Sequence, residues 1–388
     1  MKVMSVLDLR PRKLGSFEEF TLSLSRSLTR RGHQSVLVFK ESPSDALLPL
    51  YRDAGAILDS KPFGPFSWEG AGALRALIRK HRPDVIHTHF INLMSWDVIA
   101  SAAFSGVKVV YSDHSSDLPK ERNLLHKALL RMGVRTFSQF PDAFVAPSDY
   151  VNTRMVNSGV APNTVRTIYN GVNLDKFSDT LASEDIRAKY NIGRDSLLVV
   201  SIAQLIPAKG IQYLIEAAGQ VVGQGADVSF IHVGDGRCLE EYKARVKQLG
   251  IEKRFIFAGL LNLPQVADIL RQCDVFTLPC TWGEAFSLVI LEAMATGKPS
   301  IVTNVGGNIS AVEDGRNGLV IPPHDAAALA DAIKKLHDNP QLRLEMGRES
   351  LTRSKYFDVQ RWVDESVDLY SRLLDGNSAK VVLGTGAP

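Results

Sequence analysis

The sequence predicts an α/β protein built from two doubly wound domains with parallel sheets. Short apolar runs rich in β-branched residues alternate along the whole chain with amphipathic segments of helical period. Most of these runs are nearly continuous, which is typical of strands that helices cover on both faces. The pattern begins again near residue 196, and 388 residues are too many for one ordinary core. We therefore expect two facing domains, with ligands at the carboxyl ends of the strands in the cleft between them.

Each expected element follows from this alternation. In the first half, strands are expected at 2–9, 34–39, 84–90, 108–114 and 142–148. In the second half, they are expected at 196–203, 228–236, 254–259, 274–279, 299–304 and 317–323. The clearest helical patterns cover 17–31, 69–81, 209–223, 237–249, 325–337 and 358–374.

The domain boundary is expected at the polar segment "YNGVNLDKFSDT", because an Asn-Gly step favours a turn. The expected division is a first domain over 1–172, a second over 173–357, a helix over 358–374 that packs back toward the first domain, and a mobile tail over 375–388.

Composition narrows the class of protein. The chain is 45% hydrophobic and 22% charged, as in soluble globular proteins, and no apolar run is long enough to cross a bilayer. Its three cysteines form no C-x-x-C pair, which suits a reducing cytoplasm and favours neither disulfides nor a metal site. Basic residues exceed acidic ones by 6 in residues 1–180, whereas acidic residues exceed basic ones by 3 in the remainder. This asymmetry is either chance or the mark of an anionic partner for the first half.

The segment "CTWGEAFSLVILEAMATGKP" holds two glutamates, Glu284 and Glu292, within an apolar run. We expect a helix to begin near Ser287, whose hydroxyl is a suitable N-cap. A helix start favours phosphate, and carboxylates accept hydrogen bonds from sugar hydroxyls, so the combination indicates a sugar nucleotide. Taken alone, the spacing favours a structural interpretation, in which Glu284 caps a neighbouring group and Glu292 is ion-paired or exposed.

The same segment resembles the E-x7-E region of retaining glycosyltransferases of GT-B fold, specifically glycosyltransferase family 4. Further segments resemble the family's landmarks in their usual order over nearly the whole chain: "LGSFEEF", "DVIHTHF", "VVYSDHSSD", "VAPSDY", "IYNGVNLDKF", "SIAQLIPAKG", "HVGDGRCLEEY", "FAGLL" and "DGRNGLVIPPHD". The resemblance implies a GT-B fold with two Rossmann-like domains, the first for the acceptor and the second for a nucleotide-diphosphate sugar. It implies no obligatory cofactor or metal.

The resemblance also implies roles for individual residues. Gly15 lies in a loop whose amides approach the diphosphate, and Lys209 brings a cation to it. Glu284 accepts hydrogen bonds from the transferred sugar, Glu292 from the ribose, and His114 contacts the sugar near the reacting centre. The other expected donor-binding residues are Ser16, Gln204, Leu261, Ala285, Phe286, Ser287 and Leu288.

Four departures from the family pattern affect these expectations. Ser16 replaces a glycine, Ala285 and Ser287 replace two more, and Ser310 stands where glutamate is common. Gln204 is the most consequential, because the arginine usual there supplies a fixed bidentate charge and glutamine supplies none.

Other enzyme classes fit less well. "VGDGRC" begins like a dinucleotide-binding motif, but Leu239 replaces its last glycine, and the chain has no P-loop. His87 and His89 alternate on one strand, yet no third metal ligand is evident.

The expected reaction is therefore retaining transfer of a hexosyl unit from a UDP- or GDP-sugar, by front-face substitution, to a saccharide or lipid-linked saccharide. Ser16, Gln204 and Ser310 leave open a non-catalytic nucleotide- or glycan-binding protein, and a sugar-nucleotide epimerase or hydrolase is the rival enzyme. Residues 118–140 form a basic amphipathic pattern that suits either an ordinary packed helix or contact with an anionic membrane. We expect a cytoplasmic protein, either free or at the inner face of the membrane, that takes part in cell-envelope or exopolysaccharide synthesis and has no nucleic-acid partner.

Overall fold

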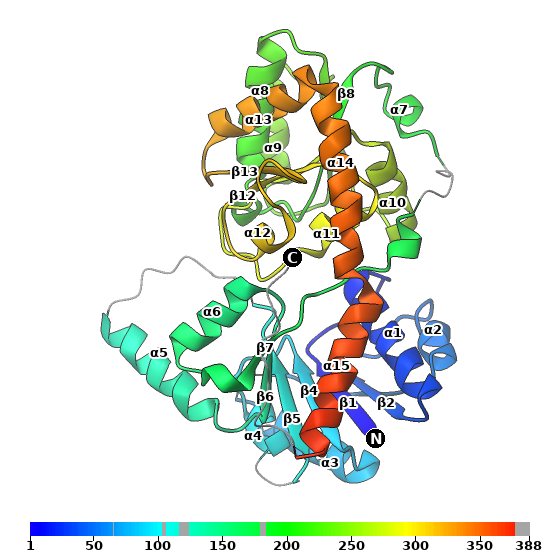
Figure 1. Ribbon diagram of the computed structural model, residues 1–388, viewed down its shortest axis with the longest axis vertical. Coiled ribbons are helices and arrows are strands. Elements are labelled where there is room, and N and C mark those ends of the chain that lie inside the picture. The colour runs from blue at the N-terminus through cyan, green and yellow to red at the C-terminus, as the bar shows by residue number, and fades with distance from the viewer. Residues whose placement is uncertain (65, 103–105, 116–123, 179–183, 377–388) are drawn as a thin grey trace. The chain divides into compact units, whose positions relative to one another are not determined.

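The computed structural model describes residues 1–64, 66–102, 106–115, 124–178 and 184–376 (Figure 1). The chain forms two compact units, which are described separately. Unit 1 contains the described residues up to Gly171 together with those from Val359 onward, and unit 2 contains the described residues of Val172–Asp358.

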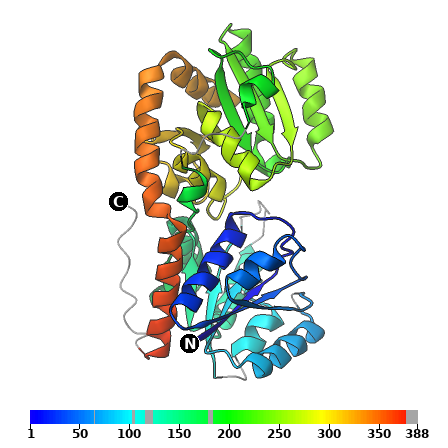
Figure 2. The ribbon, with the colours of Figure 1, turned by 90° about the vertical axis from the view of Figure 1, so that its right-hand side faces the viewer.

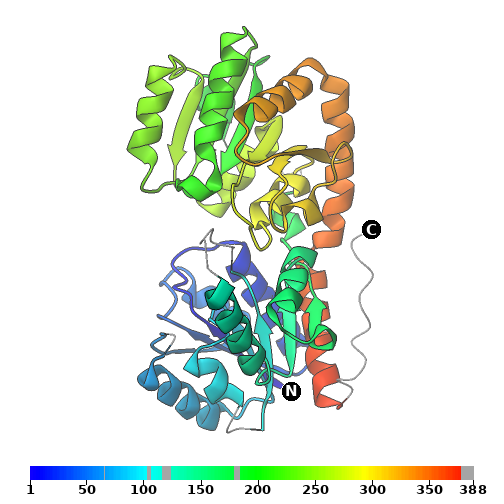
Figure 3. The same ribbon diagram turned by 90° about the vertical axis from the view of Figure 1, so that its left-hand side faces the viewer.

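Unit 1 is built on a parallel sheet with strand order β3-β2-β1-β4-β5-β6-β7. The strands are β1 (Lys2–Leu7), β2 (Gln34–Phe39), β3 (Ala56–Ser60), β4 (Val85–His89), β5 (Lys108–Ser112), β6 (Ala143–Ala146) and β7 (Val165–Thr167). The helices are α1 (Ser16–Arg30), α2 (Leu48–Asp53), α3 (Trp68–His81), α4 (Trp96–Ala102), α5 (Leu124–Phe137), α6 (Asp149–Ser158), η1 (Pro162–Thr164) and α15 (Val359–Leu374). Figure 3 shows α5 beside α6.

The last helix, α15, packs against α1 and so belongs to unit 1 (Figure 2). Its buried face carries Trp362 and Tyr370, two turns apart, and the Trp362 ring stacks on Phe20 of α1 at 3.7 Å between centroids. Aromatic stacking of this kind adds to the free energy of burying the two side chains. Arg31 just past α1 also pairs with Asp364 of α15 at 2.5 Å.

Unit 2 is built on a second parallel sheet with strand order β10-β9-β8-β11-β12-β13. The strands are β8 (Leu197–Ile202), β9 (Val228–Val233), β10 (Phe255–Gly259), β11 (Val275–Leu278), β12 (Ser300–Thr303) and β13 (Gly318–Ile321). The helices are η2 (Leu174–Lys176), α7 (Ile186–Lys189), η3 (Pro207–Lys209), α8 (Ile211–Gly223), α9 (Leu239–Gln248), α10 (Leu263–Gln272), α11 (Leu288–Ala295), α12 (Asn308–Ala311), α13 (Ala326–Asp338), α14 (Pro340–Ser354) and η4 (Lys355–Phe357). Residues of α8, α9 and α13 form one hydrophobic core with β8 and β9.

The strands expected from apolar runs are all present, which confirms the doubly wound α/β prediction. Strands β3 and β7 are not predicted by the apolar runs of the sequence. Each lies at an edge of the unit 1 sheet, and Ile57 of β3 is exposed, so neither shows the continuous apolar run of a central strand. β7 also has only three residues.

One expected helix begins later than predicted, and two other expected segments lie partly outside the described residues. The helix expected at 209–223 begins at Ile211, because Gly210 adopts a left-handed conformation (φ 71°) and separates it from η3. Within the amphipathic segment 118–140, Leu124–Phe137 is helical and residues 138–140 are not, whereas residues 118–123 lie outside the described part of the chain. The expected tail at 375–388 also lies outside it from residue 377 onward. Within the described residues, no helix combines the length and apolar composition needed to cross a bilayer.

Candidate active site

Three loops of unit 2 leave the carboxyl ends of its strands and carry residues expected to bind the donor. Gln204 and Lys209 follow β8, Leu261 follows β10, and Glu284 follows β11. Strands β8 and β11 are neighbours in the sheet, so their loops emerge side by side. This is the edge at which open α/β sheets bind ligands.

Lys209 and Glu284 form an ion pair, with Lys209 Nζ 2.7 Å from Glu284 Oε1. The two side chains are only 21% and 13% exposed, respectively, so solvent screens the pair weakly. Burial by itself lowers the pKa of Lys209, but the charges of Glu284 and Cys280 and the hydrogen bond to Glu284 raise it above its usual value. Lys209 is therefore cationic at neutral pH.

Close backbone contacts hold this ion pair in place. Gly306 has a φ of 60°, and a Cβ there would lie 2.2 Å from the Glu284 carbonyl oxygen. The Gly307 N–H donates to that same oxygen at 2.7 Å. On the other side, a Cβ at Gly210 would lie 1.7 Å from the Pro279 oxygen, and the Thr281 N–H donates to the Ala208 oxygen at 2.9 Å. Only glycine permits these approaches.

Helix α11 begins at Leu288, so the unpaired amides of its first turn directly follow the Glu284 loop in the chain. Ala285 and Phe286 are buried, and Glu292 lies one turn inside the helix with 8% exposure. Ser287 occupies the expected N-cap position in extended conformation, but its side chain makes no capping hydrogen bond, so the predicted capping role is wrong.

Gln204 lies in the loop after β8 with its side chain exposed. The loop itself is held by the Leu205 N–H, which donates to the Asp235 oxygen at 2.9 Å, and by the close approach of Gly234 to Ala203. Leu261 is half-buried in the loop that leads to α10.

Unit 1 places its expected residues at the carboxyl ends of β1, β4 and β5, which are neighbours in its sheet. Gly15 is the N-cap of α1, and Ser16 is the helix's first residue. The Gly15 N–H donates to Glu18 Oε2 at 3.1 Å. In this conformation, the amide expected to face the diphosphate is therefore already hydrogen-bonded to a carboxylate. Burial raises the pKa of that Glu18 carboxyl.

His114 belongs to a cluster of rings at the same edge. Its Nε2 lies 3.1 Å from His89 Nδ1, and its ring stacks on Phe90 at 4.6 Å. Phe17 of α1 meets His114, His89 and Phe90 edge-on, with centroids 5.3, 5.4 and 4.7 Å away. His87 lies deeper, with Nδ1 2.6 Å from Tyr370 Oη and Nε2 2.7 Å from Ser112 Oγ.

Burial keeps these three histidines neutral at physiological pH. Burial lowers the pKa of His87 to about 3, with a smaller effect from His114, and lowers the pKa of His114 to about 4 against the opposing charge of Asp113. Burial, His87 and His114 together hold the pKa of His89 well below its usual value. The cluster therefore offers neutral nitrogens for hydrogen bonding rather than positive charge.

Three further residues at these sites, Phe17, Gly306 and Gly307, are not among the residues predicted from the sequence. Phe17 contacts His114, His89 and Phe90, and its place two residues after Gly15, at the start of an amphipathic helix, is the signal that could have found it. The sequence around Gly306 and Gly307 gives no sign of a role, and only their packing on Glu284 reveals one.

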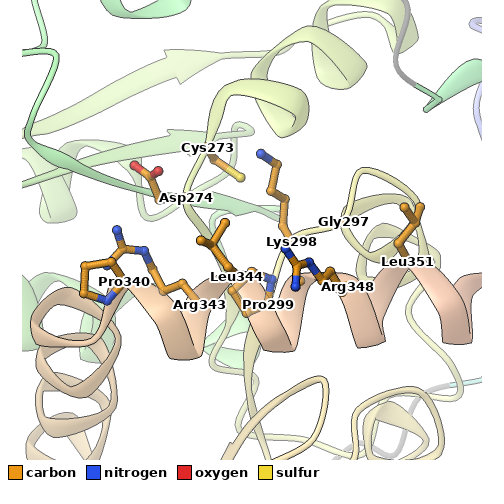
Figure 4. Close-up of a pocket in the computed structure, with 11 residues that line it drawn as sticks. Cys273, Asp274, Gly297, Lys298, Pro299, Pro340, Arg343, Leu344, Arg348 and Leu351 are labelled. Carbon is orange, nitrogen blue, oxygen red and sulfur yellow. The ribbon is translucent and has the colours of Figure 1, made fainter.

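The described residues contain no group of three or more His, Cys, Asp or Glu side chains arranged to hold a metal ion. A cavity of about 360 Å³ is present in unit 2, lined by Cys273, Lys298, Arg348 and neighbouring residues of α14 (Figure 4). Cys273 precedes β11 and Lys298 precedes β12, so the cavity lies at the amino ends of the strands. It is thus separate from the candidate site, which lies at their carboxyl ends.

Two family models match consecutive parts of the chain. Residues 17–176 match Glycosyltransferase Family 4, and residues 182–353 match Glycosyl transferases group 1. The first match falls within unit 1 except for its last residues, and the second falls within unit 2.

Relatives of the chain also carry the names of glycosyltransferases. The chain is 28% identical over 315 residues to the UDP-Gal:alpha-D-GlcNAc-diphosphoundecaprenol alpha-1,3-galactosyltransferase of Escherichia coli, with 77% of this chain and 78% of that protein covered. It is 27% identical over 394 residues to the D-inositol 3-phosphate glycosyltransferase of Mycolicibacterium smegmatis, covering 94% and 88%.

Among solved structures, Anabaena Alr3699/HepE in complex with UDP superposes with a TM-score of 0.80 at 21% identity, covering 96% of this chain and 100% of that one. This likeness confirms the GT-B fold expected from the sequence. The chain therefore belongs to the family 4-like glycosyltransferases of GT-B fold, and it is a hexosyltransferase that uses a nucleotide-sugar donor.

Proposed function

We propose that the protein is a retaining glycosyltransferase that moves a hexosyl unit from a UDP-sugar to a saccharide, or lipid-linked saccharide, by front-face substitution. The bond from the anomeric carbon to the diphosphate oxygen breaks, and a bond to the acceptor oxygen forms on the same face of the sugar. The acceptor's proton passes to the departing diphosphate oxygen, so the anomeric configuration is kept.

The observation that carries this proposal is the Lys209–Glu284 ion pair beside the first turn of α11. Lys209 supplies a cation for the diphosphate, and Glu284 supplies a carboxylate for the sugar hydroxyls. The first turn of α11 adds the positive end of a helix. When a donor binds, Lys209 exchanges part of its contact with Glu284 for a phosphate oxygen. Glu284 then orients the transferred sugar and stabilises the positive charge that develops at the anomeric carbon.

The remaining donor contacts are assigned by position. Glu292 accepts hydrogen bonds from the ribose hydroxyls, and the loop at Leu261 lies against the base. Residues 285–288 direct backbone amides toward sugar and phosphate oxygens, and Gln204 donates a neutral hydrogen bond to the diphosphate. From unit 1, we assign Gly15 and Ser16 to the diphosphate, His114 to the transferred sugar, and the unit as a whole to the acceptor. Glu18 leaves the Gly15 amide when the phosphate arrives.

The proposal of a UDP-sugar is supported by two comparisons: a relative named for UDP-Gal and a structural neighbour in complex with UDP. Thermal unfolding of the purified protein with UDP, GDP, ADP and TDP tests which nucleotide base the protein binds. A ligand at about a hundred times its Kd adds about 2.7 kcal/mol to the unfolding free energy, so UDP alone is expected to raise Tm clearly. A selective shift with another nucleotide would contradict the UDP assignment.

The reaction type needs a separate assay. Incubation with a UDP-hexose should give little free sugar or epimer unless an acceptor is added, after which a product with retained anomeric configuration appears in the NMR spectrum. Acceptor-independent turnover would instead favour the epimerase or hydrolase. Nucleotide binding without any turnover, on a panel that includes lipid-diphosphate saccharides, would favour a binding protein.

We further propose peripheral contact with an anionic membrane through residues 118–140. In the described part of this segment, Leu129 and Met132 of α5 are 54% and 62% exposed, and Arg131 and Arg135 are exposed as well. Apolar and basic side chains together favour the interface of an anionic bilayer. Flotation with vesicles that contain anionic lipid should recover the wild type but less of a Leu129→Ser/Met132→Ser variant. Equal recovery of both proteins would count against this surface.

A further inference from the structure

The contact between His89 and His114 determines where each ring carries its proton. His89 Nδ1 lies 3.1 Å from His114 Nε2, which is a hydrogen-bond distance between two imidazole nitrogens. Each neutral imidazole has one N–H donor and one acceptor nitrogen. One of the two rings must therefore donate at this contact while the other accepts.

The surroundings of His89 decide between the two arrangements. The side chain is 1% exposed, and among the described residues Nε2 of His89 has no hydrogen-bond partner. If Nδ1 of His89 accepted, its proton would sit on Nε2 and form a buried N–H without an acceptor, which native structures rarely contain. If Nδ1 of His89 carries the proton, only the lone pair of Nε2 lacks a partner, which costs less free energy than a buried N–H without an acceptor. His89 is therefore the donor.

Neighbouring groups offer no alternative partner for His89. His87 lies at 4.0 Å between ring centroids, but both of its nitrogens are engaged, one by Tyr370 and one by Ser112. Phe17 and Phe20 cover His89 with apolar rings. The orientation of the His89 ring is thus set by packing, and its protonation by the absence of an acceptor at Nε2 within the described residues.

The consequence falls on His114. Because its Nε2 accepts from His89, the proton of the neutral His114 ring lies on Nδ1. Among the described residues, that nitrogen has no hydrogen-bond partner, and the carboxylate of adjacent Asp113 is already bound to Arg154 and Ser115. Stacking on Phe90 fixes the ring plane.

We propose that His89 is a positioning residue that holds His114 in the Nδ1–H tautomer, so that His114 donates a neutral hydrogen bond from Nδ1 to an oxygen of the transferred sugar. The sugar contact rests on the function proposed above, whereas the tautomer is a property of the free protein. The two parts can therefore fail separately.

The tautomer is tested on the full chain without ligand. Long-range proton–nitrogen correlation spectra of histidine-labelled protein at neutral pH separate the Nδ1–H, Nε2–H and charged forms, and the signals missing from His114→Asn and His89→Asn assign the two rings. Nδ1–H is expected for both. An Nε2–H or charged His114 in the wild type overturns the proposal, whatever the activity of the enzyme.

The role of His114 in sugar transfer is tested by substitutions that move the hydrogen-bond donor of this side chain. Asparagine places an amide N–H near the position of Nδ1, whereas glutamine places it near Nε2. His114→Asn should therefore retain at least tenfold more kcat/KM than His114→Gln, with matched Tm values. Likewise, His89→Asn keeps a donor toward His114 and should retain activity that His89→Leu loses. Equal losses in both pairs, with the Nδ1–H tautomer present, would remove the sugar contact and leave the tautomer assignment standing.

If His89→Leu does not fold, the wild-type spectrum still tests the tautomer of His114. The comparison of His114→Asn with His114→Gln still tests its contact with the sugar. In a folded His89→Leu protein, the His114 spectrum should shift toward the Nε2–H form, because its Nε2 no longer accepts a hydrogen bond from His89. An unchanged Nδ1–H spectrum would show that His89 does not set the tautomer.

Discussion

Lys209 and Glu284 lie 75 residues apart in the chain, yet their side chains meet at 2.7 Å at the carboxyl edge of the unit 2 sheet. The contact exists because β8 and β11 are neighbours and because glycines let their loops approach closely. The proposed reaction needs both groups at once, one for the leaving diphosphate and one for the sugar.

Removing either charge should mainly slow the chemical step. Glu284→Gln and Lys209→Met are each expected to lower kcat about 10²- to 10³-fold, as for loss of a preorganised electrostatic group. Because the residues are in contact, the double variant should lose less than the product of the two single losses. Steady-state kinetics with a UDP-sugar measure this, and Lys243→Ala, at an exposed ion pair on α9, is the control. Near-normal turnover of Glu284→Gln would eliminate its proposed role.

Gln204→Arg should tighten binding of the nucleotide diphosphate. A hydrogen bond from a charged donor contributes about 1–2 kcal/mol more than a neutral one, which corresponds to roughly tenfold in Kd. Calorimetric titration with UDP measures the change, and Gln204→Met, which is similar in size but has no donor, controls for the shape of the side chain. A Kd that is unchanged or weaker in the arginine variant would show that this loop does not reach the diphosphate.

Gly306→Ala should damage activity through the backbone of Glu284. A Cβ at this position would lie 2.2 Å from the Glu284 oxygen and 2.4 Å from its nitrogen, so the Glu284 loop has to move. Gly315 is the matched control, because its φ of 76° is also left-handed but no atom lies within 4 Å of the added Cβ. Both alanines should cost roughly 1–2 kcal/mol of stability for the left-handed conformation.

Only Gly306→Ala should also lower kcat, and its unfolding free energy should fall further than that of Gly315→Ala. Chemical denaturation and kinetics on the two variants give the comparison. Similar kcat values would mean that the position of Glu284 tolerates displacement.

Acid should destabilise unit 2 through His232, whose Nε2 lies 3.1 Å from the Ala203 oxygen. Burial lowers the pKa of His232 to about 4, against the partly opposing effect of that hydrogen bond. Between about pH 6.5 and 4 the unfolded chain therefore binds a proton that the folded protein does not, and stability falls as the pH falls.

His232→Gln keeps an N–H near Ala203 but cannot titrate. Its unfolding free energy should depend less on pH in this window, by up to about 1.4 kcal/mol per pH unit. Denaturant titrations of both proteins at pH 7, 6 and 5 measure the slopes. Parallel slopes would show that His232 is protonated in the folded state or lies in a part that opens locally.

The sequence by itself determined the architecture. Continuous apolar runs such as those of β8 and β9 predict strands, because central parallel strands bury both faces. The helical periods between these runs predict the helices equally clearly. The motifs around Lys209 and around Glu284 are each local in the chain, so the residues expected to bind the donor could also be proposed from the sequence. The edge strands β3 and β7 were not predicted, because they bury less surface and their sequences therefore carry a weaker signal.

Only the tertiary structure decided how those residues act on one another. The Lys209–Glu284 contact, the role of Gly306 and the His89–His114 hydrogen bond all join segments that are distant in the chain, and sheet order brings them together. Whether a histidine is buried, and which of its nitrogens finds a partner, depends on α1 and α15 packed around it. Hydrogen-bond donors and close contacts are properties of that packing, whereas periodicity and motif are properties of the chain.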